Sequence, residues 1–273
     1  MPLVLVLRNA SAGPLAVDLA GILPARVGSQ TAAEVARVPI TADGRPCELG
    51  AVFAVSGSAA DGRIECRGDF SRVHHVGAGL AAGRIDVAGD VGRHAGEGMC
   101  GGTLAVTGSA GDWLACAMTG GTVHVGGHCG DNAAAALPGS PHGMQGGAVL
   151  VAGSAGHLAG ARMRRGVLAI GGGCGVAAAF EMRAGTVVVA GPLGEHPAAG
   201  MRRGSLIALS VPLRLPATFA RGAAWCPPFL PLLLRRLAAA GMGMAVAPAG
   251  PWRHWHGDLL TGGRGEVWCP EAA

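Results

Sequence analysis

The sequence contains no lysine and no tyrosine, and aromatic residues make up only 4% of its 273 residues. All 21 basic residues are therefore arginines, and the net charge is only +4. Six of the arginines lie in the segment 162–203, where Phe180 is the only aromatic residue. Because nucleobases bind by stacking on aromatic side chains next to basic clusters, this composition argues against a nucleic-acid-binding protein.

Long apolar runs are also absent. The longest, such as 3–7 and 229–234, are far shorter than the roughly 20 residues that cross a bilayer. The segment 1–7 lacks the basic region and the small-residue cleavage site of a signal peptide. We therefore expect a cytoplasmic protein without a membrane segment.

Motifs of catalysis and metal binding are missing as well. Eight cysteines are present, but no two have Cys-x-x-Cys spacing, so we expect free thiols rather than a zinc or redox site. His74 and His75 adjoin, and His254 and His256 lie close together, but no carboxylate or cysteine is placed in the sequence to complete a catalytic or metal set. We predict no catalytic, cofactor-binding or metal-ligating residues in this chain.

Glycine is the abundant residue, with 49 copies, and it repeats as Gly-x5-Gly-x2-Gly. The unit returns every 19 residues, except for one interval of 21 and one of 26. The opening glycines are Gly62, Gly83, Gly102, Gly121, Gly147, Gly166, Gly185 and Gly204. The second and fourth residues after each of them are apolar, which is typical of a strand with one buried face.

A unit of 19 residues is too short to hold a strand, its turns and a crossover helix. We therefore expect an all-β fold in which the units stack as a parallel β-solenoid, a single-stranded β-helix with coils of about 19 residues. Residues 1–60 would form an N-terminal cap, 61–210 the glycine-rich solenoid, and 211–273 a C-terminal tail with a short helix. The extra residues of the longest unit predict a protruding loop around 137–143.

Methionine occupies one position of the repeat, three residues before the opening glycine. The residues there are Leu80, Met99, Met118, Met144, Met163, Met182 and Met201. Stacked units would place these side chains about 4.8 Å apart. We expect an internal row in which flexible thioethers fill the core, rather than a soft-metal site.

The outward-facing position of the strands changes character along the repeat. Its residues are Glu65, Asp86, Ala105, His124, Leu150, Ala169, Val188 and Ile207. A face in contact with water would stay polar, so the apolar half should be covered. We expect Leu150, Val188 and Ile207 to contact either the C-terminal tail or a partner subunit.

Arginine also recurs at one position. Arg164, Arg183 and Arg202 stand two residues before successive opening glycines, with Arg165 and Arg203 beside them. Stacked guanidinium groups repel one another, although water and salt screen part of this repulsion. These arginines form either a solvated basic edge or a surface that docks an acidic partner or a polyanionic ligand.

Several stretches carry a resemblance to a known family. They are 68–79 (GDFSRVHHVGAG), 89–92 (GDVG), 111–114 (GDWL), 162–166 (RMRRG), 257–259 (GDL) and 262–267 (GGRGEV). The sequence resembles the C-type subunit of formylmethanofuran dehydrogenase and, more closely, its bacterial counterpart in the formyltransferase/hydrolase complex. The glycine pattern alone is also similar to the C-terminal domain of the glutamate synthase large chain.

The resemblance implies a structural or organising subunit without catalytic residues. Its expected partners are an amidohydrolase-like subunit that holds zinc, a formyltransferase, and a homologue of the molybdopterin-type subunit. Such a complex passes a formyl group from tetrahydromethanopterin to a methanofuran-type carrier and releases formate. The glutamate-rich tail of that carrier would be an anionic ligand for Arg164, Arg183 and Arg202.

Two other classes stay open. A glutamate-synthase-like β-solenoid domain would accompany amidotransferase and flavin segments, and this sequence has neither. A free-standing solenoid enzyme would need acids clustered on one face, whereas Asp86, Asp90, Asp112 and Asp131 are spread over different repeat positions and units.

Overall fold

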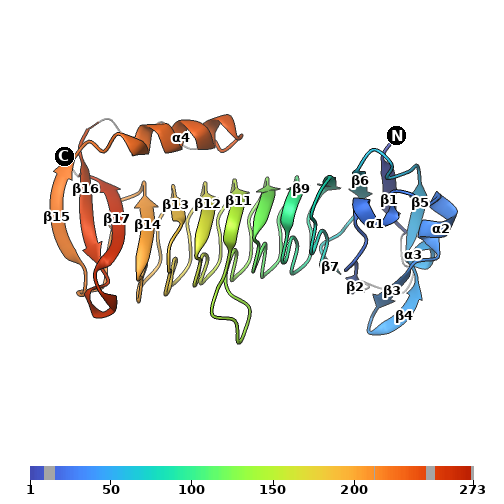
Figure 1. The fold of residues 1–273 in the computed structure, drawn as a ribbon, viewed down its shortest axis with the longest axis horizontal. Coiled ribbons are helices and arrows are strands. Elements are labelled where there is room, and N and C mark those ends of the chain that lie inside the picture. The colour runs from blue at the N-terminus through green and yellow to red at the C-terminus, as the bar shows by residue number, and fades with distance from the viewer. Residues whose placement is uncertain (9–15, 212, 244–249, 272–273) are drawn as a thin grey trace.

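The computed structural model describes residues 1–8, 16–211, 213–243 and 250–271. Most of its regular structure is one 13-stranded sheet that runs along an elongated molecule (Figure 1). The helices are few and mostly short: α1 (Pro24–Val27), α2 (Ala32–Ala36), α3 (Leu49–Val52) and α4 (Phe229–Ala239). The expected all-β class is confirmed. Among the described residues, no helix has the length and apolar character needed to cross a membrane.

The repeat units supply the central strands of the sheet. These are β6 (Arg63–Arg67), β8 (Arg84–Ala88), β9 (Cys100–Val106), β10 (Gly120–Val125), β11 (Gln145–Val151), β12 (Arg165–Ile170), β13 (Thr186–Val189) and β14 (Arg203–Ala208). Each pairs in parallel with the next, so that Ile64 lies opposite Ile85 and Ile85 opposite Leu104. A second parallel ladder of single bridges runs from Phe70 to Leu193, one residue from each unit. Equivalent residues of successive units are therefore neighbours in space.

The opening glycines are needed for both their backbone angle and their size. All eight have positive φ, from +66° at Gly102 to +99° at Gly204. At Gly166 a Cβ atom would lie 2.7 Å from the carbonyl oxygen of Gly147 and 2.7 Å from Met144 Cε. In this pair of units, the methyl group of the methionine thus fills the space left by the opening glycine of the next unit.

The methionine row is buried as predicted. Leu80 is 1% exposed, and Met99, Met118, Met144, Met163, Met182 and Met201 are each 0% exposed. Because the methionines repeat at the interval of the strands, one row of thioethers fills the interior along the repeat. The loop expected around 137–143 lies between β10 and β11 and leaves the stack in Figure 1.

The N-terminal residues end the sheet on one side. Strand β1 (Leu3–Leu7) pairs in parallel with β6 and antiparallel with β5 (Phe53–Ser56). Strands β4 (Arg45–Glu48), β3 (Pro39–Ala42), β2 (Val17–Asp18) and β7 (Val73–His74) form a second sheet in that order. The parallel pairing of β2 with β7 connects this segment to the first repeat unit.

The C-terminal residues continue the sheet on the other side. Strand β17 (Arg264–Pro270) pairs in parallel with β14, which places Arg264 opposite Arg203 and Gly265 opposite Gly204. Strands β16 (Trp252–Gly257) and β15 (Ala220–Trp225) follow in antiparallel pairings. Although the sequence pattern stops after Leu209, the chain therefore returns to add one more parallel strand to the stack.

Helix α4 lies along the later repeat strands and covers the outward apolar row (Figure 1). Leu150, Ala169, Val188 and Ile207 are at most 3% exposed. They form one cluster with Leu230, Leu234 and Leu237 of α4 and with Trp252 and Trp268. Leu150, Val188 and Ile207 are therefore no partner face: of the two expected covers, the chain's own tail is the one that buries them.

Asp258 is the one charged residue that is buried among the described residues, with 5% of its surface exposed. Its carboxylate accepts hydrogen bonds from the backbone N–H groups of Gly200 and Leu260, each at 3.0 Å. Burial alone would raise the pKa of this carboxyl, but the hydrogen bonds outweigh burial and hold the pKa below its ordinary value. Asp258 thus joins the last repeat unit to the strands that follow it.

Replacing Asp258 by Asn should lower the free energy of unfolding at pH 7 by about 1–3 kcal/mol, because buried N–H groups lose a charged acceptor. Since the pKa of Asp258 is lower in the folded state, its contribution is present above the unfolded pKa of about 4 and is lost as the pH falls through the folded pKa. Urea unfolding of both proteins at several pH values should show the gap closing in acid. Glu195→Gln, at an exposed position, is the control and should leave stability unchanged; a gap that stays constant with pH would contradict the assignment.

Candidate functional site

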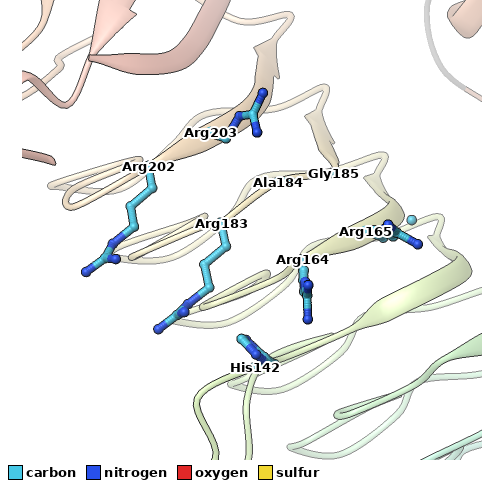
Figure 2. A pocket seen from close by; sticks show the side chains of 9 residues that line it. His142, Arg164, Arg165, Arg183, Ala184, Gly185, Arg202 and Arg203 are labelled. Carbon is cyan, nitrogen blue, oxygen red and sulfur yellow. The ribbon is translucent and has the colours of Figure 1, made fainter. Parts of the chain in front are cut away.

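Five arginines gather along one groove of about 590 Å³ at the turns that precede β12, β13 and β14. They are Arg164, Arg165, Arg183, Arg202 and Arg203, and His142 lines the groove with them. Figure 2 shows Arg164, Arg183 and Arg202 at the same turn of successive units, with Arg165 and Arg203 beside them. The structure thus brings together every arginine that the sequence singled out. We call this surface the arginine groove.

The backbone fixes the spacing of the groove. The N–H groups of Arg164, Arg183 and Arg202 each donate to the carbonyl of the methionine one unit earlier, Met144, Met163 and Met182 respectively, at 2.8 Å. The three guanidinium groups therefore start from equivalent backbone positions about 4.8 Å apart. The backbone of the buried methionine row therefore fixes the positions of these arginines at the surface.

The arginine groove carries uncompensated positive charge. Among the described residues, none of its five arginines forms an ion pair, whereas Arg162 nearby pairs with Glu181 at 2.8 Å. A guanidinium group presents its N–H donors as a planar fork that matches a carboxylate. A row of such forks can bind a strip of carboxylates, but it supplies neither a nucleophile nor a general base.

One more residue lines the groove, and another lies next to it in the sheet; neither was singled out from the sequence. His142 comes from the loop between β10 and β11 and reaches the groove (Figure 2). Arg264 lies opposite Arg203 in the parallel pairing of β14 with β17, so it continues the position of Arg203 by one strand. The motif GGRGEV at 262–267 contains an Arg-Gly pair like those at 165–166 and 203–204. This pair could have identified Arg264 from the sequence.

The structure places the two histidine pairs of the sequence in different surroundings. His254 stacks on Trp268 with ring centroids 4.1 Å apart, and burial is the main reason that its pKa is lowered. His75, however, lies next to His94 and Glu97, whose ligand atoms are close enough to share an ion. The sequence pattern did not show this neighbour, because Glu97 comes from the next unit of the stack.

These features define a class of protein: an elongated all-β chain of stacked parallel strands that presents a row of arginines. No family model matches the chain, and no curated protein matches it. Among solved structures it is similar to a chain in the crystal structure of the formyltransferase/hydrolase complex (FhcABCD) from Methylorubrum extorquens in complex with methylofuran. The two chains are 39% identical with a TM-score of 0.91, over 98% of this chain and 100% of the other. The chain therefore belongs to the family of subunits of the formyltransferase/hydrolase complex.

Proposed function

We propose that this chain is the C-type subunit, with a structural and organising role, of a formyltransferase/hydrolase complex. The observation that carries the proposal is the similarity over the whole length of both chains, at 39% identity. We further infer that residues 61–210 form a parallel β-solenoid, closed by 1–60 on one side and by 211–273 on the other. The two parallel ladders of the repeat support this inference.

In this proposal the complex moves a formyl group from tetrahydromethanopterin to a methanofuran-type carrier and releases formate. The Methylorubrum extorquens complex was solved with methylofuran, which supports a carrier of this type. The chemistry is assigned to an amidohydrolase-like partner with zinc, a formyltransferase, and a molybdopterin-type homologue. This chain would supply no catalytic residue. Its eight free cysteines fit a reducing compartment, and we place the complex in the cytoplasm.

We propose that the arginine groove binds carboxylates. The favoured ligand is an acidic surface of a partner subunit, and the alternative is a glutamate-rich carrier tail. The five arginines lack ion pairs among the described residues, and their spacing repeats with the strands. A glutamate-rich chain or an acidic partner surface would neutralise the repulsion within the row. Either ligand would be held by charge-assisted hydrogen bonds.

Purification of the tagged chain from its native cells tests this role in the complex. We expect an amidohydrolase-like protein and a formyltransferase to co-purify, and the eluate to transfer formyl groups and release formate. Mass spectrometry identifies the partners, and an enzymatic assay measures formate. A monodisperse chain that carries no partner and no activity would overturn the proposal.

Replacing Arg164, Arg183 and Arg202 together by Ala should lower the affinity for the docked ligand by about 10–100-fold. The reason is that exposed charge-assisted hydrogen bonds contribute roughly 1 kcal/mol each. The measurement is binding of the purified partner proteins and, separately, of a polyglutamate peptide. Loss of partner affinity alone identifies docking of a partner, and loss of peptide affinity alone identifies the carrier tail.

A control triple removes the same charge elsewhere on the chain. Arg214, Arg235 and Arg236 are exposed, and their replacement by Ala should leave both affinities unchanged. If the groove variant also leaves both affinities unchanged, the arginines are a solvated edge and the docking proposal fails.

A further inference from the structure

A cluster of two histidines and one glutamate lies far from the arginine groove, near the N-terminal end of the repeat. His75, His94 and Trp113 occupy the same corner of three successive units, with φ of 56°, 60° and 62°. The rings of His75 and His94 stack with centroids 4.9 Å apart, and Trp113 stacks on His94 at 6.0 Å. The repeat thus places two imidazoles side by side at a fixed separation.

Glu97 is the third member of the cluster, and its carboxylate lies beside both imidazole rings. Its Oε2 lies 2.6 Å from His94 Nδ1 and 3.8 Å from His75 Nε2. One ligand atom from each of the three residues lies within 4.8 Å of the others. The side chains are 26–31% exposed, so an ion and its water can reach the cluster.

Asp18 approaches the opposite edge of His75. Its Oδ1 lies 3.2 Å from His75 Nδ1, yet that nitrogen is buried and has no hydrogen-bond partner of good geometry among the described residues. Asp18 belongs to β2, which pairs with β7 just before His75. In metal sites, a histidine that binds the ion through one ring nitrogen usually has a carboxylate next to its other nitrogen. This carboxylate fixes the tautomer of the imidazole.

We propose that His75 Nε2, His94 Nδ1 and Glu97 Oε2 bind one divalent transition-metal ion of the Zn²⁺ type, with Asp18 orienting His75 and water completing the site. Imidazole nitrogen and carboxylate oxygen are ligands that zinc prefers. Two atoms bound to the same ion lie at most about 4.2 Å apart. Glu97 Oε2 is within this limit of both His94 Nδ1 and His75 Nε2, whereas the two rings, which are stacked with an interplanar angle of 25°, must turn for both nitrogens to face the ion. This inference goes beyond the proposed function and does not depend on it.

The charge and the surroundings agree with a cation. Glu97 and Asp18 supply two carboxylates within 3.8 Å of the His75 nitrogens, which matches the charge of a divalent ion. The Cys116 thiol lies 4.0 Å from His94 Nδ1. A bound ion would connect β2 of the N-terminal segment to the first two repeat units.

The test uses the purified full-length chain, freed of metal by a chelator, with Zn²⁺ and Co²⁺ alone as probes. We expect saturable binding of one ion per chain by calorimetry, a visible absorption band with Co²⁺, and a higher midpoint of thermal unfolding with Zn²⁺. Binding should weaken in acid, because protons compete with the metal ion for its ligand atoms.

Asparagine is the appropriate substitution for the histidines, because Asn132 occupies the same corner with φ of 62°. His75→Asn, His94→Asn and Glu97→Gln should each weaken Zn²⁺ binding at least tenfold, and Asp18→Asn should weaken it by roughly 10–100-fold. His196 is the matched control, since it shares the corner with φ of 55° and is exposed. His196→Asn should bind Zn²⁺ like the unmodified chain.

Circular dichroism of the metal-free variants checks that each is folded before titration, and any one folded ligand variant is enough for the comparison. The proposal is overturned if no saturable binding occurs, if the ligand variants bind Zn²⁺ as the unmodified chain does, or if His196→Asn loses binding to the same degree. Since no partner protein or carrier is present in the test, its outcome is independent of the role in the complex.

Discussion

Replacing Gly166 by Ala should lower the free energy of unfolding by about 2–5 kcal/mol, because the new Cβ combines backbone strain with a steric clash. The φ of Gly166 is +94°, which L side chains rarely adopt. Its Cβ would approach the Gly147 carbonyl oxygen and Met144 Cε to 2.7 Å each. Met144 could rotate, but the carbonyl belongs to the adjacent unit and cannot move without weakening the ladder.

Gly139→Ala is the matched control for this substitution. Gly139 also has a positive φ, +79°, but no described atom lies within 4 Å of the position of its Cβ. It should therefore cost only the backbone strain, about 1–2 kcal/mol. Urea unfolding followed by circular dichroism measures both. Equal losses would mean that close approach between units contributes nothing, contrary to the role assigned to the opening glycines.

Replacing Leu230 by Ala should lower the free energy of unfolding by about 2–5 kcal/mol, as expected for a large buried side chain that leaves a cavity. Leu230 is 0% exposed and packs in the cluster that α4 forms with Val188 and Ile207. Loss of this contact also weakens the cover over an apolar strip of the sheet, so we expect the variant to aggregate on heating. Urea unfolding and light scattering measure the two effects.

Leu232 gives the same substitution on the same helix without burial. It is 59% exposed, so Leu232→Ala should change stability by no more than about 0.5 kcal/mol. If Leu230→Ala and Leu232→Ala have equal effects, α4 does not hold its place on the sheet through the buried leucines.

Much of the repeat could be predicted because its information is local and periodic. Once the 19-residue interval is recognised, residues at the same position of successive units must be neighbours in a parallel stack. The burial of the methionine row and the alignment of Arg164, Arg183 and Arg202 both follow from this register. The family resemblance depended on the same segments, and the similarity to the Methylorubrum extorquens chain confirms that the chain belongs to the subunits of the formyltransferase/hydrolase complex.

Of the two candidate sites, only the arginine groove was predicted from the sequence. The arginine groove was recognised because its residues share one repeat position. The cluster of His75, His94 and Glu97 was missed because Glu97 occupies a different repeat position from the two histidines, and Asp18 comes from outside the repeat. A comparison of each residue only with its own repeat position cannot detect such a cluster.

By itself the sequence determined the all-β class, the interval of the repeat, the buried methionines and the alignment of the arginines, because a stack of equal units converts spacing along the chain into neighbours in space. Only the tertiary structure decided that α4 covers Leu150, Val188 and Ile207, that β17 returns to extend the sheet, and that Glu97 and Asp18 flank His75. The physical reason is that α4, β17 and Asp18 lie outside the periodic pattern, and that Glu97 occupies a different repeat position from His75. Such segments pack where an apolar face of the sheet is uncovered or where a strand edge is unpaired.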